Sequence, residues 1–138
     1  MASGGARNRS GPAVNPHSAR SEQRGIKFAS LPAEGFKGRV PKFPMPPRLV
    51  KRWEETEEGR RYEVVDRAAT ELVAEREAAM WRWAWRTPQA AAWAKPSESW
   101  RVPTVALWVR TYVLCESSEA TAADKGSLHR FADQIGLT

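Results

Sequence analysis

Residues 62–85, YEVVDRAATELVAEREAAMWRWAW, are the stretch that decides the fold class. The stretch is rich in Ala, Glu and Arg and contains no Gly or Pro, which is typical of a helix. Its apolar side chains recur three, four or seven residues apart, as they do on one face of a helix. The residues of that face are Tyr62, Val65, Ala69, Leu72, Ala79 and Trp83. The pattern therefore predicts a long helix over 62–85.

Three tryptophans crowd the end of this helix, in the run Trp81-Arg82-Trp83-Ala84-Trp85. Because a helix turns by about 100° per residue, Trp81 and Trp85 lie on one side and Trp83 on the other. A helix end in a small monomer seldom has neighbours on both sides, so the pattern favours packing between subunits. Ordinary core packing within one chain is the alternative. The predicted interface residues are Trp81, Trp83, Trp85, Trp93 and Trp108.

Shorter helices are expected on both sides of this one. The first covers about 48–58, because Pro47 suits a first turn and Gly59 suits a helix end. Another leads through residues 87–93, where Pro88 fits the first helical position. Both expectations rest on local end signals alone.

Two further helices are expected in the C-terminal part. The stretch 100–116 is apolar almost all round, which is typical of a helix at the centre of a bundle. A final helix covers about 120–135, with a narrow apolar stripe and Gly136 as its cap. We therefore predict an all-α fold, in which residues 48–138 form a small bundle of four to five helices.

Residues 1–47 differ in kind from the rest of the chain. They hold eight basic and two acidic residues and thus the whole net charge of +6, while residues 48–138 hold 14 of each. They are rich in Pro and Gly and poor in large apolar side chains, so they cannot offset the backbone entropy that ordering costs. We expect a flexible basic arm, largely disordered, whose last part, residues 31–47, is an extended strap lying on a partner surface.

The composition excludes several classes of protein. Cys115 has no second cysteine for a disulfide, and only His17 and His129 could join it at a structural zinc site. The phosphate-binding glycine loop of nucleotide hydrolases is missing, and no apolar run reaches the roughly 18 to 20 residues that span a bilayer. We expect Cys115 to be a buried thiol and His129 a surface residue. The sequence therefore predicts a cytosolic protein that is not an enzyme, with no metal, cofactor or membrane contact.

The basic arm predicts contact with nucleic acid, because flexible Lys and Arg side chains displace the counterions condensed on DNA. A charged tail that only keeps the protein soluble is the alternative. The predicted phosphate-binding residues are Arg7, Arg9, Arg20, Arg24, Lys27, Lys37, Arg39 and Lys42. Two other functions stay open: a protein-interaction scaffold docked through the strap, and a small helix-turn-helix regulator built from residues 85–116. In the regulator, only Arg101 and Arg110 would reach base edges.

Five stretches occur in a distinctive order along nearly the whole chain. They are Arg9-Ser10-Gly11-Pro12 with Arg24-Gly25, LPAEGFKGRVPKFPMP (31–46), WRTPQAAAW (85–93), VALWVRTYV (105–113) and LHRFADQIGLT (128–138). Together they resemble the small subunit of phage terminase, in the form found in tailed phages of actinobacteria. Two features depart from that family: Ala132 stands where an acidic residue is usual, and this chain stops at Thr138, where relatives continue with a basic and aromatic stretch.

The resemblance implies a non-catalytic protein of viral genome packaging that assembles into a ring-like homo-oligomer in the cytoplasm of the bacterial host. It implies three partners, which are viral double-stranded DNA, the terminase large subunit and further copies of the chain. The ATPase and nuclease of the large subunit would be regulated by this protein. The stop at Thr138 puts in question any role that the family carries in a C-terminal tail.

Overall fold

The computed structural model describes residues 31–137, of which residues 32–137 belong to a compact unit that runs from Pro32 to Thr138. Its elements in chain order are β1 (Lys51–Glu55), β2 (Arg61–Val65), α2 (Arg67–Ala84), α3 (Pro88–Trp93), the 3-10 helix η2 (Pro96–Arg101), α4 (Val102–Cys115) and α5 (Ala122–Ile135). The unit is mostly helical but has a small two-stranded sheet, so the all-α prediction is wrong for residues 51–65. The expected boundary at residue 47 lies inside this unit, because the strap packs on the helices.

A β-hairpin replaces the helix that was expected over 48–58. β1 and β2 pair antiparallel. Thr56 and Arg60 continue the pairing beyond the strands, so that residues 57–59 form a three-residue turn. The Thr56 N–H donates to the Arg60 carbonyl at 2.8 Å, and the Thr56 carbonyl accepts from the Gly59 N–H at 3.0 Å. Gly59 has the left-handed φ of 83° that the last position of such a turn requires. The glycine that we interpreted as a helix end therefore closes a hairpin.

Helix α2 begins at Arg67, five residues later than expected. The Asp66 side chain caps its N-terminus by accepting from the Ala69 N–H at 3.0 Å. The predicted apolar face is also wrong, because Leu72 and Trp83 are 66% and 54% exposed. The buried residues of the helix are Glu77, Met80, Trp81 and Ala84. They recur by threes and fours as well, on another side of the same helix.

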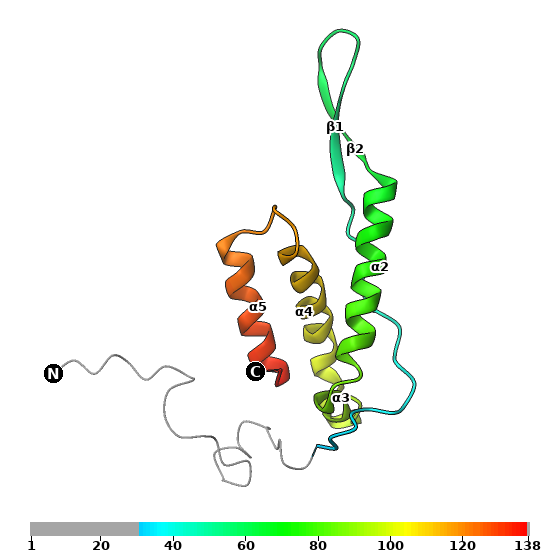
Figure 1. The fold of residues 1–138 in the computed structure, drawn as a ribbon, viewed down its shortest axis with the longest axis vertical. Helices are drawn as coiled ribbons and strands as arrows, with labels where there is room; N and C mark the ends of the chain where they lie inside the picture. Colours follow the sequence, from blue (N-terminus) through cyan, green and yellow to red (C-terminus); the bar gives the residue numbers. More distant parts are fainter. Residues whose placement is uncertain (1–30, 138) are drawn as a thin grey trace, which may run out of the picture. The chain divides into compact units, whose positions relative to one another are not determined.

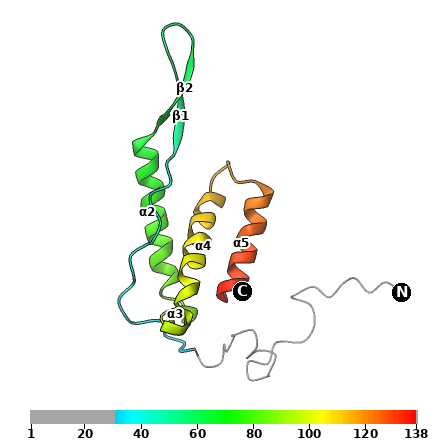
Figure 2. The ribbon, with the colours of Figure 1, turned by 180° about the vertical axis from the view of Figure 1, so that it is seen from behind.

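The remaining helices follow the prediction closely. α3 begins at Pro88, and α4 follows the 3-10 helix with Val102 as its first residue. α4 lies between α2 and α5 (Figures 1 and 2), as expected for a helix that is apolar almost all round. α5 begins with a capping box of Thr121 and Asp124 and ends at Gly136, which has the left-handed φ of 81°.

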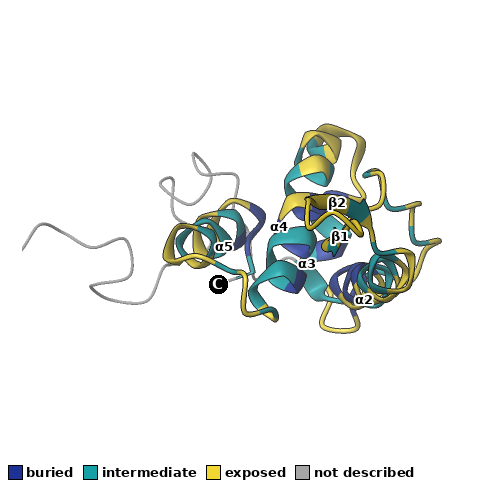
Figure 3. Cartoon of the chain, turned by 90° about the horizontal axis from the view of Figure 1, so that it is seen from above, coloured by how far each residue is buried: buried dark blue, intermediate teal, exposed yellow. Residues whose placement is uncertain are grey.

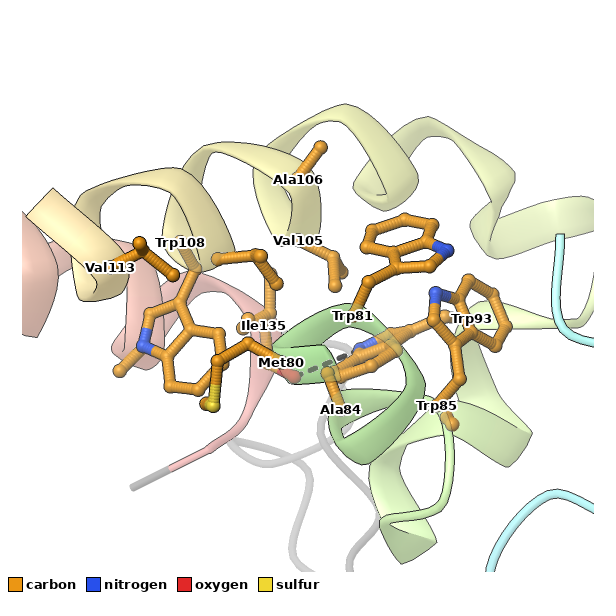
Figure 4. Packing of buried hydrophobic residues seen from close by; sticks show 13 residues of the cluster. Met80, Trp81, Ala84, Trp85, Trp93, Val105, Ala106, Trp108, Val113 and Ile135 are labelled. Atoms are coloured by element: carbon orange, nitrogen blue, oxygen red, sulfur yellow. Dashed lines mark hydrogen bonds between the residues drawn. The ribbon is translucent and has the colours of Figure 1, made fainter. Parts of the chain in front are cut away.

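The core fills the space between these helices. Figure 3 shows that the buried residues of α2, α4 and α5 face one another, whereas the hairpin is exposed. Trp85 packs edge-on against Trp81 and Trp93, with ring centroids 5.6 Å apart in both pairs. The Trp93 indole N–H donates to the Ile135 carbonyl at 3.0 Å and so ties α3 to the end of α5 (Figure 4).

Candidate nucleic-acid and assembly surfaces

Residues 32–47 of the strap lie on the helical body of the same chain. Phe36 packs edge-on against Trp85 with ring centroids 5.6 Å apart, and Phe43 packs in the same way against Trp81 at 5.2 Å. The Trp81 indole N–H donates to the Pro41 carbonyl at 2.7 Å. The strap is extended, as expected, but the surface beneath it belongs to the same chain. The prediction of a partner surface is therefore wrong.

Two arginines fasten the strap backbone to the helices. The Arg86 guanidinium donates to the Phe36 carbonyl at 3.1 Å and to the Gly38 carbonyl at 3.4 Å. The Arg110 guanidinium donates to the Pro46 carbonyl near the other end of the strap. Because Arg86 lies in the turn that follows α2 and Arg110 lies on α4, the strap is fixed to the body at both ends.

A buried ion pair holds the second of these arginines in place. Glu77 of α2 is only 2% exposed, and its carboxylate accepts hydrogen bonds of 2.8 and 3.1 Å from Arg110 of α4. The same guanidinium lies 5.7 Å from the centroid of the Phe43 ring. The Arg110 side chain thus joins α2, α4 and the strap. A buried charge pair needs such additional partners to offset the free energy that its desolvation costs.

The cations of the strap point away from this contact surface. Lys37, Arg39 and Lys42 are exposed, and within residues 31–137 none of them forms an ion pair. Residues 31–47 carry three basic residues against Glu34 alone, whereas residues 48–137 are balanced. The strap therefore presents a local excess of positive charge to solvent. The other predicted phosphate-binding residues, Arg7, Arg9, Arg20, Arg24 and Lys27, lie outside the described residues.

Four of the five predicted interface tryptophans are buried in the single chain. They are Trp81, Trp85, Trp93 and Trp108, each at most 6% exposed. The first three pack against one another or against Phe36 and Phe43 of the strap, and Trp108 packs against Trp83 and Tyr112. These four indoles have no surface to offer to a second subunit, so the interface prediction is wrong for them. Trp83 is the exception. One face of its ring stacks on Trp108 with centroids 6.0 Å apart, and the side chain remains 54% exposed.

The helix-turn-helix interpretation of residues 85–116 does not fit the fold. α4, the expected recognition helix, has helices on both sides (Figure 1). Both of the expected base-reading residues are also engaged: Arg101 pairs with Glu98 at 2.7 Å and donates to the Gln134 carbonyl, and Arg110 pairs with Glu77. This helix cannot enter a DNA groove without leaving the core.

The titrating groups with shifted pKa values lie on the surface. Hydrogen bonds from Arg52 and Tyr62 lower the pKa of Glu54 on the hairpin, and the bond to Glu54 raises the pKa of Tyr62. In the first turn of α5, bonds from the Thr121 backbone and side chain lower the pKa of Asp124. These shifts are explained by pairs within the hairpin and within one helix cap, so none of them marks a reactive centre.

The two residues singled out for their chemistry lie on different helices. Cys115 is half-buried at the end of α4, less enclosed than expected, and His129 on α5 is exposed, as expected. Among residues 31–137, no three His, Cys, Asp or Glu side chains gather as metal ligands would. No helix in that range is long and apolar enough to cross a membrane.

A shallow open depression of about 620 Å³ lies where the start of the strap meets α3 and η2. Phe36 and Ala91 contribute apolar surface, and Lys37 and Lys95 stand at its wall together with Glu34. Its openness and mixed charges give it no defined ligand.

Comparison with known proteins identifies no relative. No family model, no curated protein and no solved structure matches this chain.

Proposed function

We propose that this chain is a non-catalytic DNA-binding subunit of a viral genome-packaging machine, of the terminase small-subunit kind. Two things support the proposal: the stretches that resemble that family and the two-sided strap. The strap is the observation that carries it. Phe36 and Phe43 pack on the body, while Lys37, Arg39 and Lys42 face solvent. A basic segment is thereby anchored without its cations being neutralised.

The physical role of such a segment is to grip phosphates. The cations between residues 7 and 42 are separated by small residues, Pro and Gly, so they suit a backbone contact that is independent of base sequence. An assembly of several copies would bring several arms to one duplex, and the local concentration of the remaining arms after the first contact would raise the avidity. The ring-like assembly and the regulation of the large subunit belong to this proposal.

One departure from the family is compatible with the fold. Ala132, where that family usually carries an acid, is a buried residue of α5. A carboxylate at that place would lose its hydration inside the core of this chain. The small apolar side chain therefore suits its environment, and the neighbouring Asp133 is exposed.

The test is the salt dependence of duplex binding. We expect binding, followed by fluorescence anisotropy of labelled DNA, to weaken with salt with a log-log slope near −5 if each arm meets about six phosphates. Replacing Lys37, Arg39 and Lys42 by Gln should reduce the magnitude of that slope by about 2.7, because each neutralised phosphate contributes about 0.9.

A matched control separates the strap from general charge. The variant R67Q/K125Q/R130Q removes three exposed cations of the helical body and should leave the slope unchanged. If the two triple variants lose the same amount of slope, the strap cations contribute only through the overall charge and make no particular contact with DNA. Binding that does not depend on salt would reject the proposal. Stimulation or inhibition of the cognate large subunit's ATPase by the wild-type chain tests the packaging role directly.

The exposed hairpin favours one second candidate, a protein-interaction scaffold without nucleic-acid contact. Its outer face carries Trp53, which is 57% exposed, and such side chains are typical of protein interfaces. The same DNA titration separates the two functions, because a scaffold would show no saturable binding to duplex DNA at any salt concentration.

A further inference from the structure

One face of the β1–β2 hairpin carries exposed apolar residues, with the Lys51–Glu63 ion pair between them. Lys51 pairs with Val65 across the strands, and the alternation of side chains puts Leu49, Trp53 and Val65 on the same face. All three are exposed, and Trp53 is the largest of them. The Arg61 guanidinium lies 5.0 Å from the centroid of the Trp53 ring, on the same face.

The hairpin receives little support from the helices. It extends beyond the N-terminal end of α2 in both side views (Figures 1 and 2). Its base is tied to α2 where the Val50 N–H donates to the Thr70 hydroxyl at 2.9 Å. A two-stranded hairpin is only marginally stable in water by itself. Exposed apolar residues gathered on such an element indicate a surface that another chain covers.

A second exposed stripe runs along α2 from Leu72 to Trp83, with the charged Arg76 between these two apolar residues. Leu72 and Trp83 are eleven residues apart, which returns them to the same side of the helix, about 17 Å from each other along its axis. On the hairpin, Leu49 and Trp53 span about 14 Å of extended chain. The two rows are thus similar in length. The outer part of Trp83 is free to receive a ring, because only its inner face stacks on Trp108.

Opposite charges border the two surfaces. At the tip of the hairpin, Glu57 and Glu58 are exposed, and neither has an ion pair with any residue from 31 to 137. At the C-terminal end of the α2 stripe, Arg82 and Arg86 are exposed. An acidic tip at one end of the molecule and a basic helix end at the other are complementary between copies of the chain.

We propose that the hairpin of one copy docks on the exposed α2 stripe of a second copy, with Trp53 against Trp83 and the acidic tip at Arg82. The inference deepens the homo-oligomer part of the proposed function and rests on it. Every copy carries both surfaces. Two copies that use them reciprocally form a dimer, and copies that use them in sequence form a ring or a filament.

The test measures assembly by native mass spectrometry and light scattering over a range of concentrations. Trp53→Ala and E57K/E58K should each raise the concentration of half-assembly by about tenfold or more, since a buried Trp anchor and a desolvated charge contact dominate such interfaces. Arg82→Glu should do the same. Arg86 is left in place because it also holds the strap. Far-UV circular dichroism checks that the helices persist, which is expected because none of the changed side chains is in the core.

Charge exchange gives the decisive comparison. The variant E57K/E58K/R82E should assemble more tightly than E57K/E58K, because the exchanged charges again attract each other. The control E119K/D133K makes the same change in net charge at two exposed acids that lie after α4 and on α5, outside the hairpin and α2, and should assemble like the wild type. The proposed contact is overturned if the losses of assembly in E57K/E58K and in Arg82→Glu simply add in E57K/E58K/R82E. It is also overturned if Trp53→Ala assembles like the wild type.

The outcomes also separate this inference from the DNA-binding role. A wild-type chain that stays monomeric overturns the docking proposal, while salt-dependent DNA binding by that monomer would leave the arm's role standing. Conversely, an assembly that depends on the hairpin but ignores DNA supports the docking contact and rejects the proposed packaging function.

Discussion

Loss of the Arg110 side chain should destabilise the fold more than loss of any other charged group on α2 or α4. The variant Arg110→Met keeps most of the length of the side chain but leaves the 2% exposed Glu77 carboxylate without the donor of its 2.8 and 3.1 Å hydrogen bonds. Breaking a buried pair in this way costs about 3–5 kcal/mol. A domain of this size has a free energy of unfolding of about 5–15 kcal/mol, so the variant should lose a large share of it.

A double-mutant cycle isolates the pair. Glu77→Leu removes the carboxylate and leaves the Arg110 guanidinium with only the Pro46 carbonyl and the Phe43 ring. The double variant E77L/R110M replaces both charges by apolar groups and should be more stable than Arg110→Met by about 2 kcal/mol or more, because no buried charge remains. Urea unfolding followed by far-UV circular dichroism measures each corner, with the m-value as a check on two-state behaviour.

The protein contains its own control for this experiment. Arg76 and Glu116 also join α2 to α4, with a shortest N to O distance of 2.8 Å, but both side chains are largely exposed. Arg76→Met should change the unfolding free energy little, because solvent screens such a pair. A cost of less than about 1 kcal/mol for Arg110→Met would contradict this role of the buried pair. Two single penalties that add in the double variant would contradict it as well. Faster proteolysis of the strap in Arg110→Met would show that the Pro46 contact is lost as well.

Three further substitutions test local features that stabilise the fold, which are two glycines with a left-handed φ and one helix N-cap. Gly35→Ala should lower the thermal midpoint, since φ is +79° and an added Cβ would stand 2.4 Å from the Arg86 carbonyl oxygen. Thr121→Ala should cost about 1 kcal/mol in urea unfolding, as the loss of an N-cap does. The bonds from Thr121 hold the pKa of Asp124 below its usual value, so their stabilisation is present above that value and is lost as the pH falls through the lowered pKa. Thr121→Ala removes only the side-chain bond and keeps the larger effect of the backbone bond, so it should flatten this part of an acid titration only in part. Gly59→Ala should speed amide exchange in β1 and β2 and leave the helices protected, because the turn needs its left-handed φ.

The helix ends that could be predicted from sequence are those set by adjacent residues. Pro88 begins α3 because its fixed φ suits a first turn, and Gly136 ends α5 because it adopts a left-handed φ without a steric penalty. The central position of α4 was also predictable, because a helix apolar all round must be covered all round. These inferences need no knowledge of which segment lies opposite.

Residues 48–65 could not be assigned in this way. A Gly such as Gly59 closes a helix C-terminus and a three-residue hairpin turn with the same left-handed φ. Only the pairing of β1 with β2 decides between the two, and pairing is a contact between segments rather than a property of either one. The β-forming character of Trp53, Tyr62 and Val64 was the signal that could have favoured strands.

The buried side of α2 was mispredicted for a similar reason. Both stripes of this helix recur by threes and fours, so periodicity alone does not tell which one faces the core. The choice depends on Phe36 and Phe43, which lie about 40 residues earlier and cover Trp85 and Trp81. Proline-rich composition made the strap look like a ligand for another protein, and nothing local distinguishes an extended segment bound in cis from one bound in trans.

Burial of these indoles changes the physical grounds for assembly. Trp81 and Trp85 were expected to need a second subunit for cover, but the strap already supplies it, so their number is no evidence for an oligomer. Self-association is now inferred from apolar residues that the single chain leaves exposed, which are Trp53 on the hairpin and Trp83 on α2. If substitution of Trp53 disperses the assembly while substitution of the strap cations weakens only DNA binding, self-association and DNA contact are carried by separate parts of the chain.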